Sequence, residues 1–186
     1  LTEVIYTMPG TYQQRNLAVA LRALLVLRDQ GLAIDADSIR SALGGVRNPG
    51  RLEVVSQSPL VIVDAAHNPQ GARALAESLS DLLSGRYKVL VLGLLDDKER
   101  AGTLAALAKN TRAVVVTRPE GSRSQAWQEV EQVWRRDFPA IKVEAAESIE
   151  RAVERAVSMV SGSDYIVITG SFHVLDQARS ALHCPF

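Results

Sequence analysis

Residues 60–69 read Leu-Val-Ile-Val-Asp-Ala-Ala-His-Asn-Pro, and this stretch decides the fold. A short apolar run ends there in an acid, a histidine, an amide and a proline, and apolar residues at helical spacing follow. Proline suits the first position of a helix and asparagine the cap before it, so we predict that Asn68 caps a helix starting near Pro69. The stretch is therefore a strand that leads directly into a helix.

Asp64 and His67 fall between the carboxyl end of this strand and the start of the helix. Open α/β sheets bind ligands beyond the carboxyl ends of their strands, and a helix N-terminus stabilises phosphate. We therefore predict that this corner is the chemical edge of the domain. Two plainer interpretations weigh about equally at this point: Asp64 is a solvated loop acid, and His67 is a histidine satisfied within a turn.

The alternation of strand and helix continues along the rest of the chain. The expected strands are 52–55, 60–63, 88–94, 113–117, 141–143 and 165–169. The expected helices lie near 71–83, 98–108, 124–136, 149–160 and 174–182. Apolar strands alternating with amphipathic helices predict an α/β fold with a doubly wound, mainly parallel, six-stranded Rossmann-like sheet.

The amino-terminal part has a different pattern. Residues 17–27 form one broad apolar helical face after Asn16, and a second short helix follows. Residues 44–50 are rich in glycine and proline and break this pattern, which indicates a domain boundary. We assign residues 1–46 to a helical segment and residues 47–186 to the α/β domain.

Composition narrows the function classes. The 21 basic and 21 acidic residues cancel, so no overall field favours nucleic acid or an anionic membrane. No apolar run reaches the roughly 18 residues that span a bilayer. The single cysteine, Cys184, excludes an internal disulfide and favours a reducing compartment such as the cytoplasm. Because Leu1 is not an initiator methionine, we expect the chain to begin inside a longer protein.

Further polar side chains lie next to other expected strands. Lys98 and Ser171 follow a strand, and Arg51 precedes one. Arg51 can present two parallel N–H groups to phosphate, Lys98 offers a point charge to an anion, and Ser171 follows a glycine that permits close backbone approach. Each also has a plain interpretation, as a surface arginine, a charged first helical turn and a helix cap. Their convergence on one sheet edge favours a binding site there.

Two phosphate-binding motifs are absent from the sequence. It contains no G-x-x-x-x-G-K-[ST] loop and no G-x-G-x-x-G turn, so a site for ATP or a dinucleotide would be incomplete in this chain alone. His173 and His183 lack the spacing of zinc ligands, and we predict no metal site.

Five segments, in order, resemble the folylpolyglutamate synthases, the folate branch of the Mur ligase superfamily. Residues 10–16 resemble G-x-H-Q-x-x-N, 49–53 P-G-R-x-E, 64–69 D-G-A-H-N-P, 93–99 G-x-x-x-D-K-D, and 169–171 T-G-S. Two positions depart from the family pattern, since Tyr12 replaces a histidine and Ala65 a glycine. The resemblance implies that residues 1–46 are the last helices of a central ATPase domain and 47–186 the complete carboxyl-terminal domain.

The resemblance also implies the reaction. In this family ATP converts a folate carboxylate to an acyl phosphate, which the amine of L-glutamate attacks to give an amide. The acceptors are tetrahydrofolate and, in some members, dihydropteroate. The P-loop and the Mg²⁺ ligands belong to an amino-terminal part outside this chain, so we expect the chain alone to be inactive. We also expect the parent to be a monomer.

Site residues follow from the matching motifs. By resemblance, Asn16 and Asp64 contact the nucleotide, Arg51 its phosphates, and His67 lines the site near the reacting phosphate. Lys98 and Ser171 match positions that hold the incoming glutamate. Two alternatives stay open: a peptidoglycan-precursor ligase, which shares the H-N-P corner, and a stand-alone nucleotide-binding regulatory module.

Overall fold

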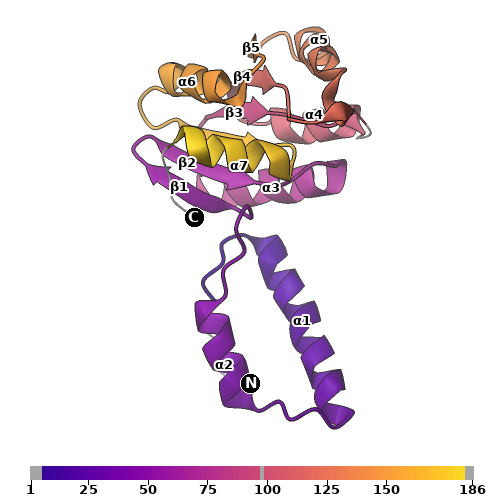
Figure 1. Cartoon of the computed structure of the whole chain (residues 1–186). Helices are drawn as coiled ribbons and strands as arrows, with labels where there is room; N and C mark the ends of the chain where they lie inside the picture. The colour runs from indigo at the N-terminus through magenta and orange to yellow at the C-terminus, as the bar shows by residue number, and fades with distance from the viewer. Residues whose placement is uncertain (1–5, 97–98, 183–186) are drawn as a thin grey trace. The chain divides into compact units, whose positions relative to one another are not determined.

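The computed structural model describes residues 6–96 and 99–182. The chain divides into two units, Leu1–Pro49 and Gly50–Phe186, and each is considered by itself (Figure 1). Among the helices within the described ranges, none has the length and apolar character needed to cross a membrane.

The first unit contains two helices, α1 (Thr11–Asp29) and α2 (Ala36–Gly45). The predicted helical face over residues 17–27 lies within α1, which begins earlier, directly after Gly10 at φ 95° in the cap position. Asn16 therefore lies inside α1, where its amide donates a 3.2 Å hydrogen bond to Oε1 of Gln13. The second helix begins where Asp35 accepts the N–H groups of two residues in its first turn.

The second unit contains the predicted six-stranded sheet. Its strands are β1 (Glu53–Gln57), β2 (Leu60–Asp64), β3 (Lys88–Leu92), β4 (Thr111–Thr117), β5 (Lys142–Ala146) and β6 (Tyr165–Thr169). Their order is β1-β2-β6-β3-β4-β5. Only β1 is antiparallel to its neighbour, so the sheet is mainly parallel as predicted.

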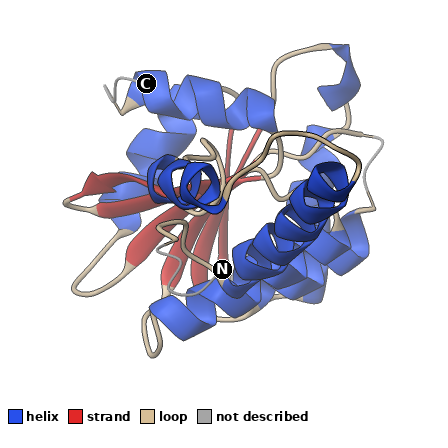
Figure 2. Ribbon diagram, turned by 90° about the horizontal axis from the view of Figure 1, so that it is seen from below, coloured by secondary structure: helices blue, strands red, loops and turns tan. Residues whose placement is uncertain are grey.

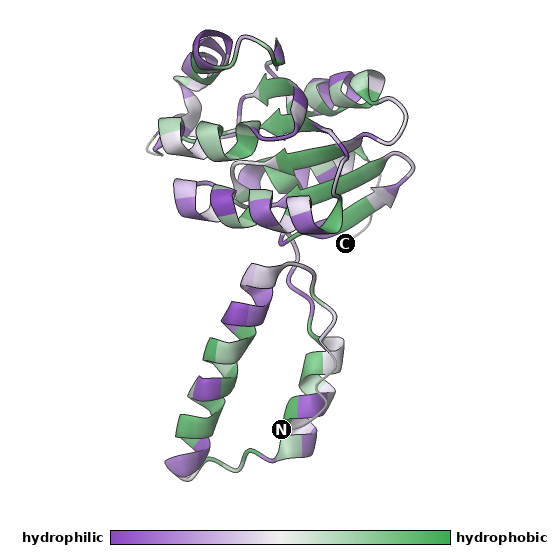
Figure 3. Ribbon diagram, turned by 180° about the vertical axis from the view of Figure 1, so that it is seen from behind, coloured by the Kyte–Doolittle hydropathy of each residue, from purple (hydrophilic) through white to green (hydrophobic). Residues whose placement is uncertain are grey.

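Helices cover both faces of this sheet (Figures 1 and 2). They are α3 (Pro69–Leu82), α4 (Arg100–Ala108), α5 (Trp127–Asp137), α6 (Ile149–Met159) and α7 (Phe172–Ala181), with a 3₁₀ turn at Ser122–Ser124. The strands in the middle of the sheet are coloured as hydrophobic while the helices carry both characters, which is typical of a sheet buried on two faces (Figure 3). The edge strands β1 and β5 also contain charged or polar residues. The doubly wound arrangement is therefore confirmed.

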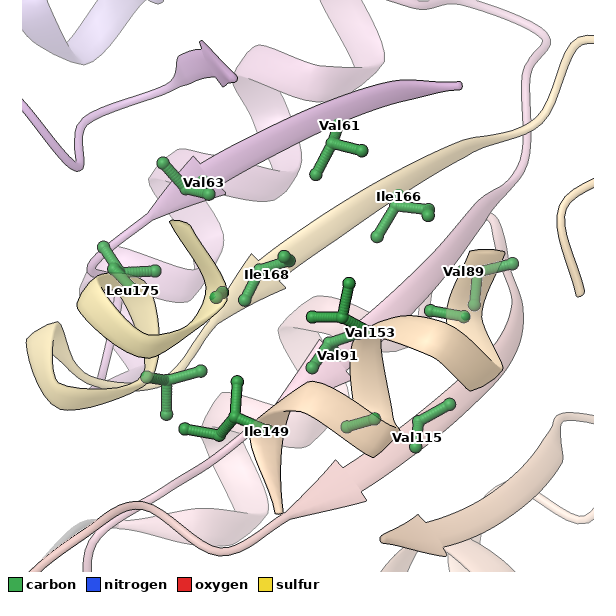
Figure 4. Close-up of a cluster of buried hydrophobic side chains, with 14 of the residues drawn as sticks. Val61, Val63, Val89, Val91, Val115, Ile149, Val153, Ile166, Ile168 and Leu175 are labelled. Carbon is green, nitrogen blue, oxygen red and sulfur yellow. The ribbon is translucent and has the colours of Figure 1, made fainter. Parts of the chain in front are cut away.

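Alternate residues of each strand pack against different helices. Val61 and Val63 of β2 lie in one buried cluster with Ile149 and Val153 of α6 and Leu175 of α7 (Figure 4). Ile62, between those two valines, is also buried, and its side chain points to the opposite face because side chains alternate along a strand. Burial on both faces explains why the central strands β2, β3, β4 and β6 read as largely apolar runs, whereas the edge strands β1 and β5 do not.

The order of the strands places the site. The chain moves outward from β2 to β3, β4 and β5 and then returns to β6, which pairs with both β2 and β3. The helix after β6 covers the opposite face from the helices after β2 and β3 (Figure 1). Such a reversal leaves a crevice at the carboxyl ends of the strands beside it. The ends of β2 and β6 are therefore the expected ligand edge.

Lys88, at the other end of β3, is a buried cation. It is 2% exposed, and its ammonium donates to the carbonyl oxygen of Lys109. Burial, with a smaller contribution from the charge of Lys109, lowers the pKa of Lys88 from 10.5 to about 8. The unfolded chain therefore binds more protons than the folded chain between those pH values, and stability rises with pH across that window.

We expect Lys88→Met to remove this pH dependence. The variant should gain up to roughly 3 kcal/mol in free energy of unfolding at pH 7.5, because a pKa difference of about 2.5 corresponds to that energy. The advantage should shrink towards pH 10.5, where the unfolded lysine also loses its proton. Urea unfolding at several pH values measures it, with exposed Lys142→Met as the control. An advantage independent of pH would contradict this assignment.

Candidate functional site

The β2–α3 corner has the predicted local structure. Oδ1 of Asn68 accepts the N–H of Gly71 at 2.8 Å, and Pro69 occupies the first turn of α3, so the predicted cap is confirmed. Nδ1 of His67 lies 2.8 Å from the carbonyl oxygen of Ala65. A carbonyl oxygen only accepts, so Nδ1 carries the proton and Nε2 of a neutral His67 is an acceptor. The ring is half-buried and is held at the start of the helix.

Asp64 orders the backbone around this corner. The side chain is 2% exposed, Oδ2 accepts the N–H of Leu52 at 2.9 Å, and Oδ1 accepts the N–H of Ala66 at 2.9 Å. A third bond, from the N–H of Ala65 to the carbonyl of Gly50, joins the same two segments. Asp64 therefore ties the P-G-R loop to the end of β2, a role that the sequence interpretation did not include. Its contact with a nucleotide stays a prediction.

The segment that holds Arg51 is fixed from both sides. Oε2 of Glu53 accepts the N–H of Gly50 at 2.7 Å, and both oxygens of Glu53 accept bonds from the guanidinium of Arg179, which is 5% exposed. The guanidinium carbon of Arg51 lies 5.3 Å from the centroid of the Phe172 ring. Arg51 is thus presented from a rigid turn between the end of β2 and the start of α7.

The T-G-S segment brings β6 into the same edge. Oγ1 of Thr169 donates to the carbonyl of Ala66 at 3.0 Å, and the N–H of Gly93 donates to the carbonyl of Thr169 at 3.1 Å. Gly170 has φ 115°, and a side chain there would meet the backbone of Gly93. The close approach of β6 to the end of β3 therefore requires glycine.

Ser171 caps α7. Its Oγ lies 3.4 Å from the N–H of Val174, and the side chain is 4% exposed. A hydroxyl that accepts one bond still has a proton to donate, so the cap and a ligand contact are compatible. The cap is observed, and the predicted contact with glutamate stays a prediction.

Four of the six predicted site residues gather at one edge of the second unit. Asp64 ends β2, His67 lies between β2 and α3, and Ser171 follows β6. Arg51 lies on the turn that is bonded to both Asp64 and Ala65. Asn16 belongs to the first unit. Lys98 lies outside the described residues.

Sequence reasoning missed Glu53 as a support and missed Arg179 and Phe172 entirely. Glu53 stands in the P-G-R-x-E motif, which was the one available signal for it. Arg179 reads in sequence as an ordinary helical cation, and its partner lies 126 positions away. Phe172 reads as an ordinary apolar residue at a helix start.

This edge is suited to binding an anion. The N-termini of α3 and α7 both lie there, each with partial positive charge, and Arg51 adds a full charge. Asp64 is enclosed by backbone N–H groups, so its charge is compensated locally. Within residues 6–96 and 99–182, no group of three or more His, Cys, Asp or Glu side chains is placed to hold a metal ion.

Comparison with known proteins identifies the domain. The family described as "Mur ligase, glutamate ligase domain" matches residues 50–172. The dihydrofolate synthase/folylpolyglutamate synthase of Mycobacterium tuberculosis is 32% identical over 96% of this chain, and the chain spans 40% of that relative's length. The corresponding Escherichia coli protein is 33% identical over 90% of this chain and 39% of its own length.

A solved structure agrees with these relatives. That of M. tuberculosis folylpolyglutamate synthase, complexed with ADP and AMPPCP, superimposes with a TM-score of 0.86 at 33% identity, over 95% of this chain and 41% of that one. The resemblance drawn from the five sequence segments is therefore confirmed. The chain belongs to the Mur ligase family, and residues 50–172 form its glutamate ligase domain.

Proposed function

We propose that this chain is the carboxyl-terminal part of an ATP-dependent ligase that joins L-glutamate to a folate. The observation that supports it most is the anion-binding edge, where Arg51, His67 and two helix N-termini meet in a glutamate ligase domain. The relatives bear the names of both folate activities, and one solved relative has Mn, AMPPNP and L-glutamate bound. Tetrahydrofolate and dihydropteroate are both candidate acceptors.

The reaction consists of two steps. The terminal carboxylate of the folate attacks the γ-phosphorus of ATP, which gives an acyl phosphate and ADP. The amine of glutamate then attacks the acyl carbon, loses a proton, and phosphate leaves as the amide forms. Negative charge on the transferred group has to be met by positioned donors and cations, while both reactants are held in line.

Each site residue of this chain has its own role in that reaction. Arg51 donates to phosphate oxygens from its fixed turn, and Asp64 keeps that turn and the β2–α3 corner in register. His67 is held through Nδ1, which leaves Nε2 for the reacting groups. Nε2 accepts a hydrogen bond when the ring is neutral and donates one when the ring is protonated. Ser171 and Lys98 bind the carboxylates of glutamate, and Asn16 contacts the nucleotide.

ATP chemistry also requires a divalent cation, for which Mg²⁺ is our proposal. On the family resemblance, we assign the Mg²⁺ ligands and the P-loop to the amino-terminal part of the parent. Mg²⁺ there would neutralise charge on the phosphates of ATP. We also propose that the parent is a cytoplasmic monomer.

The surface of α1 supports the existence of such a part. Val19 is 71% exposed, and Val26 and Leu27 lie on the same helix with about two-fifths of their surface exposed. These residues, together with Ala18, Arg22 and Ala23, line a shallow apolar groove. An apolar helix surface of this kind is suited to packing against another part of the same protein. We propose that the remainder of the central ATPase domain, in the amino-terminal part of the parent, supplies that part.

Product analysis on the full-length parent tests the proposal. With ATP, L-glutamate and a tetrahydrofolate or dihydropteroate, we expect one ADP for each glutamate added, detected by mass spectrometry. The 186-residue chain alone should show no turnover. Absence of folate product at any glutamate concentration, with product from a peptidoglycan precursor instead, would replace this function by the second Mur-type candidate.

A further inference from the structure

Phe172 is a large apolar side chain in an unusual place. It is the first residue of α7, directly after the cap Ser171, and 51% of its surface is exposed at the ligand edge. The neighbouring Val174 and Leu175 are buried, so the hydrophobic contribution of α7 to the core does not depend on this ring. The ring is therefore available for a role at the ligand edge.

The ring lies against the turn that presents Arg51. A Cβ built on Gly50 would be 3.4 Å from Cε1 of Phe172, so the edge of the ring lies beside that turn. The guanidinium carbon of Arg51 lies over the ring, 5.3 Å from its centroid. That distance is within the range of a cation–π contact.

This contact limits the positions that the arginine can occupy. An exposed arginine has several rotatable bonds and loses considerable side-chain entropy when a ligand fixes it. A guanidinium stacked on a ring is already ordered, while its N–H groups in the guanidinium plane stay available for phosphate oxygens. The stack therefore prepares Arg51 for an anion without using its donors.

We propose that Phe172 is a positioning residue that holds the Arg51 guanidinium ready for a phosphate group at the carboxyl edge of β2 and β6. The identity of the anion as a phosphate of ATP rests on the proposed ligase function. The stacking itself does not, and it can be tested separately.

The structure provides a matched control at the opposite edge of the sheet. Arg112 lies over Tyr87 with its guanidinium carbon 5.0 Å from the ring centroid, and Tyr87 is 49% exposed. Tyr87 directly precedes β3, so it stands at the amino end of that strand. Tyr87→Leu therefore removes an arginine–aromatic stack of similar geometry away from the ligand edge.

The first arm of the test is spectroscopic and needs no activity. In NMR spectra of this chain, the Nε–H signal of Arg51, identified by its loss in Arg51→Lys, should be displaced by the ring current of Phe172. Phe172→Leu should abolish that displacement and lower the order of the side chain, and Phe172→Tyr should preserve both. An Arg51 signal that is the same in wild type and Phe172→Leu would overturn the proposal.

The second arm is kinetic and uses the full-length parent. Phe172→Leu should raise KM for ATP about three- to fivefold with kcat within about twofold, as expected for loss of one exposed cation–π contact. Phe172→Tyr should restore KM, and Tyr87→Leu should leave it unchanged. A raised KM beside an unaltered Arg51 signal would mean that the ring contacts the nucleotide itself, which contradicts positioning. If the wild-type parent ligates no glutamate, the proposed function fails while the spectroscopic arm still decides the role of Phe172.

Discussion

Gly170→Ala is expected to destabilise the α/β domain by about 3 to 5 kcal/mol. A Cβ at this position would lie 2.3 Å from the carbonyl oxygen and 2.7 Å from the carbonyl carbon of Gly93. Both contacts are with backbone, so no side-chain rotation relieves them. The φ of 115° adds strain of about 1–3 kcal/mol for any residue with a Cβ, and overpacking typically adds a similar amount.

A second glycine separates the two causes. Gly121 has φ 107°, but among the described residues other than its two chain neighbours, no atom lies within 4 Å of the position its Cβ would take. Gly121→Ala should therefore show the conformational strain alone, about 1–3 kcal/mol. Urea unfolding of both variants measures the difference, which we expect to be about 1–3 kcal/mol, the cost of overpacking. Equal losses would mean that the approach of β6 to the end of β3 is not tight.

Arg51→Ala should lower kcat/KM of the full-length parent about 100-fold for ATP-dependent glutamate addition. Among the predicted site residues that the structure describes in the second unit, Arg51 carries the full positive charge. It lies on the turn that Asp64 and Glu53 hold in place. Loss of one positioned donor to a developing oxyanion reduces kcat about 10²- to 10³-fold in other enzymes. The fall should exceed that of Phe172→Leu, because alanine removes the charge itself.

Its control is Arg155→Ala, an exposed arginine on α6. The same change in net charge should alter kcat/KM less than about twofold, since solvent screens such charges. Melting temperatures of the two variants should match that of the wild type within a few degrees. A full rate in a folded Arg51→Ala protein would remove Arg51 from the site.

The sheet could be predicted from sequence because each central strand is buried on both faces. Runs such as residues 60–63 and 166–168 are wholly aliphatic and contain no polar residue that would suggest another period. The cap at Asn68 followed from local chemistry alone. The start of α1 could not be predicted in this way. The cap there is Gly10, which has no side chain to form a capping hydrogen bond.

The candidate site was predictable in outline for a topological reason. Parallel strands bring their carboxyl ends to one edge, so residues as distant as His67 and Ser171 could be placed together without a structure. The contacts that support these residues could not be predicted from the sequence. The bonds of Asp64 to Leu52, and of Glu53 to Arg179, depend on which loop crosses which strand end, and the sequence does not specify that geometry.

The most direct test of the central claim is the structure of the full-length parent with AMPPNP and L-glutamate. The quantities to measure are the distances from the nearest phosphate oxygen to the Arg51 guanidinium and to Nε2 of His67. We expect hydrogen-bond distances of about 2.7–3.2 Å to Arg51, with His67 lining the same pocket. Phosphates bound away from the carboxyl ends of β2 and β6 in the closed enzyme, with both side chains in solvent, would contradict the account.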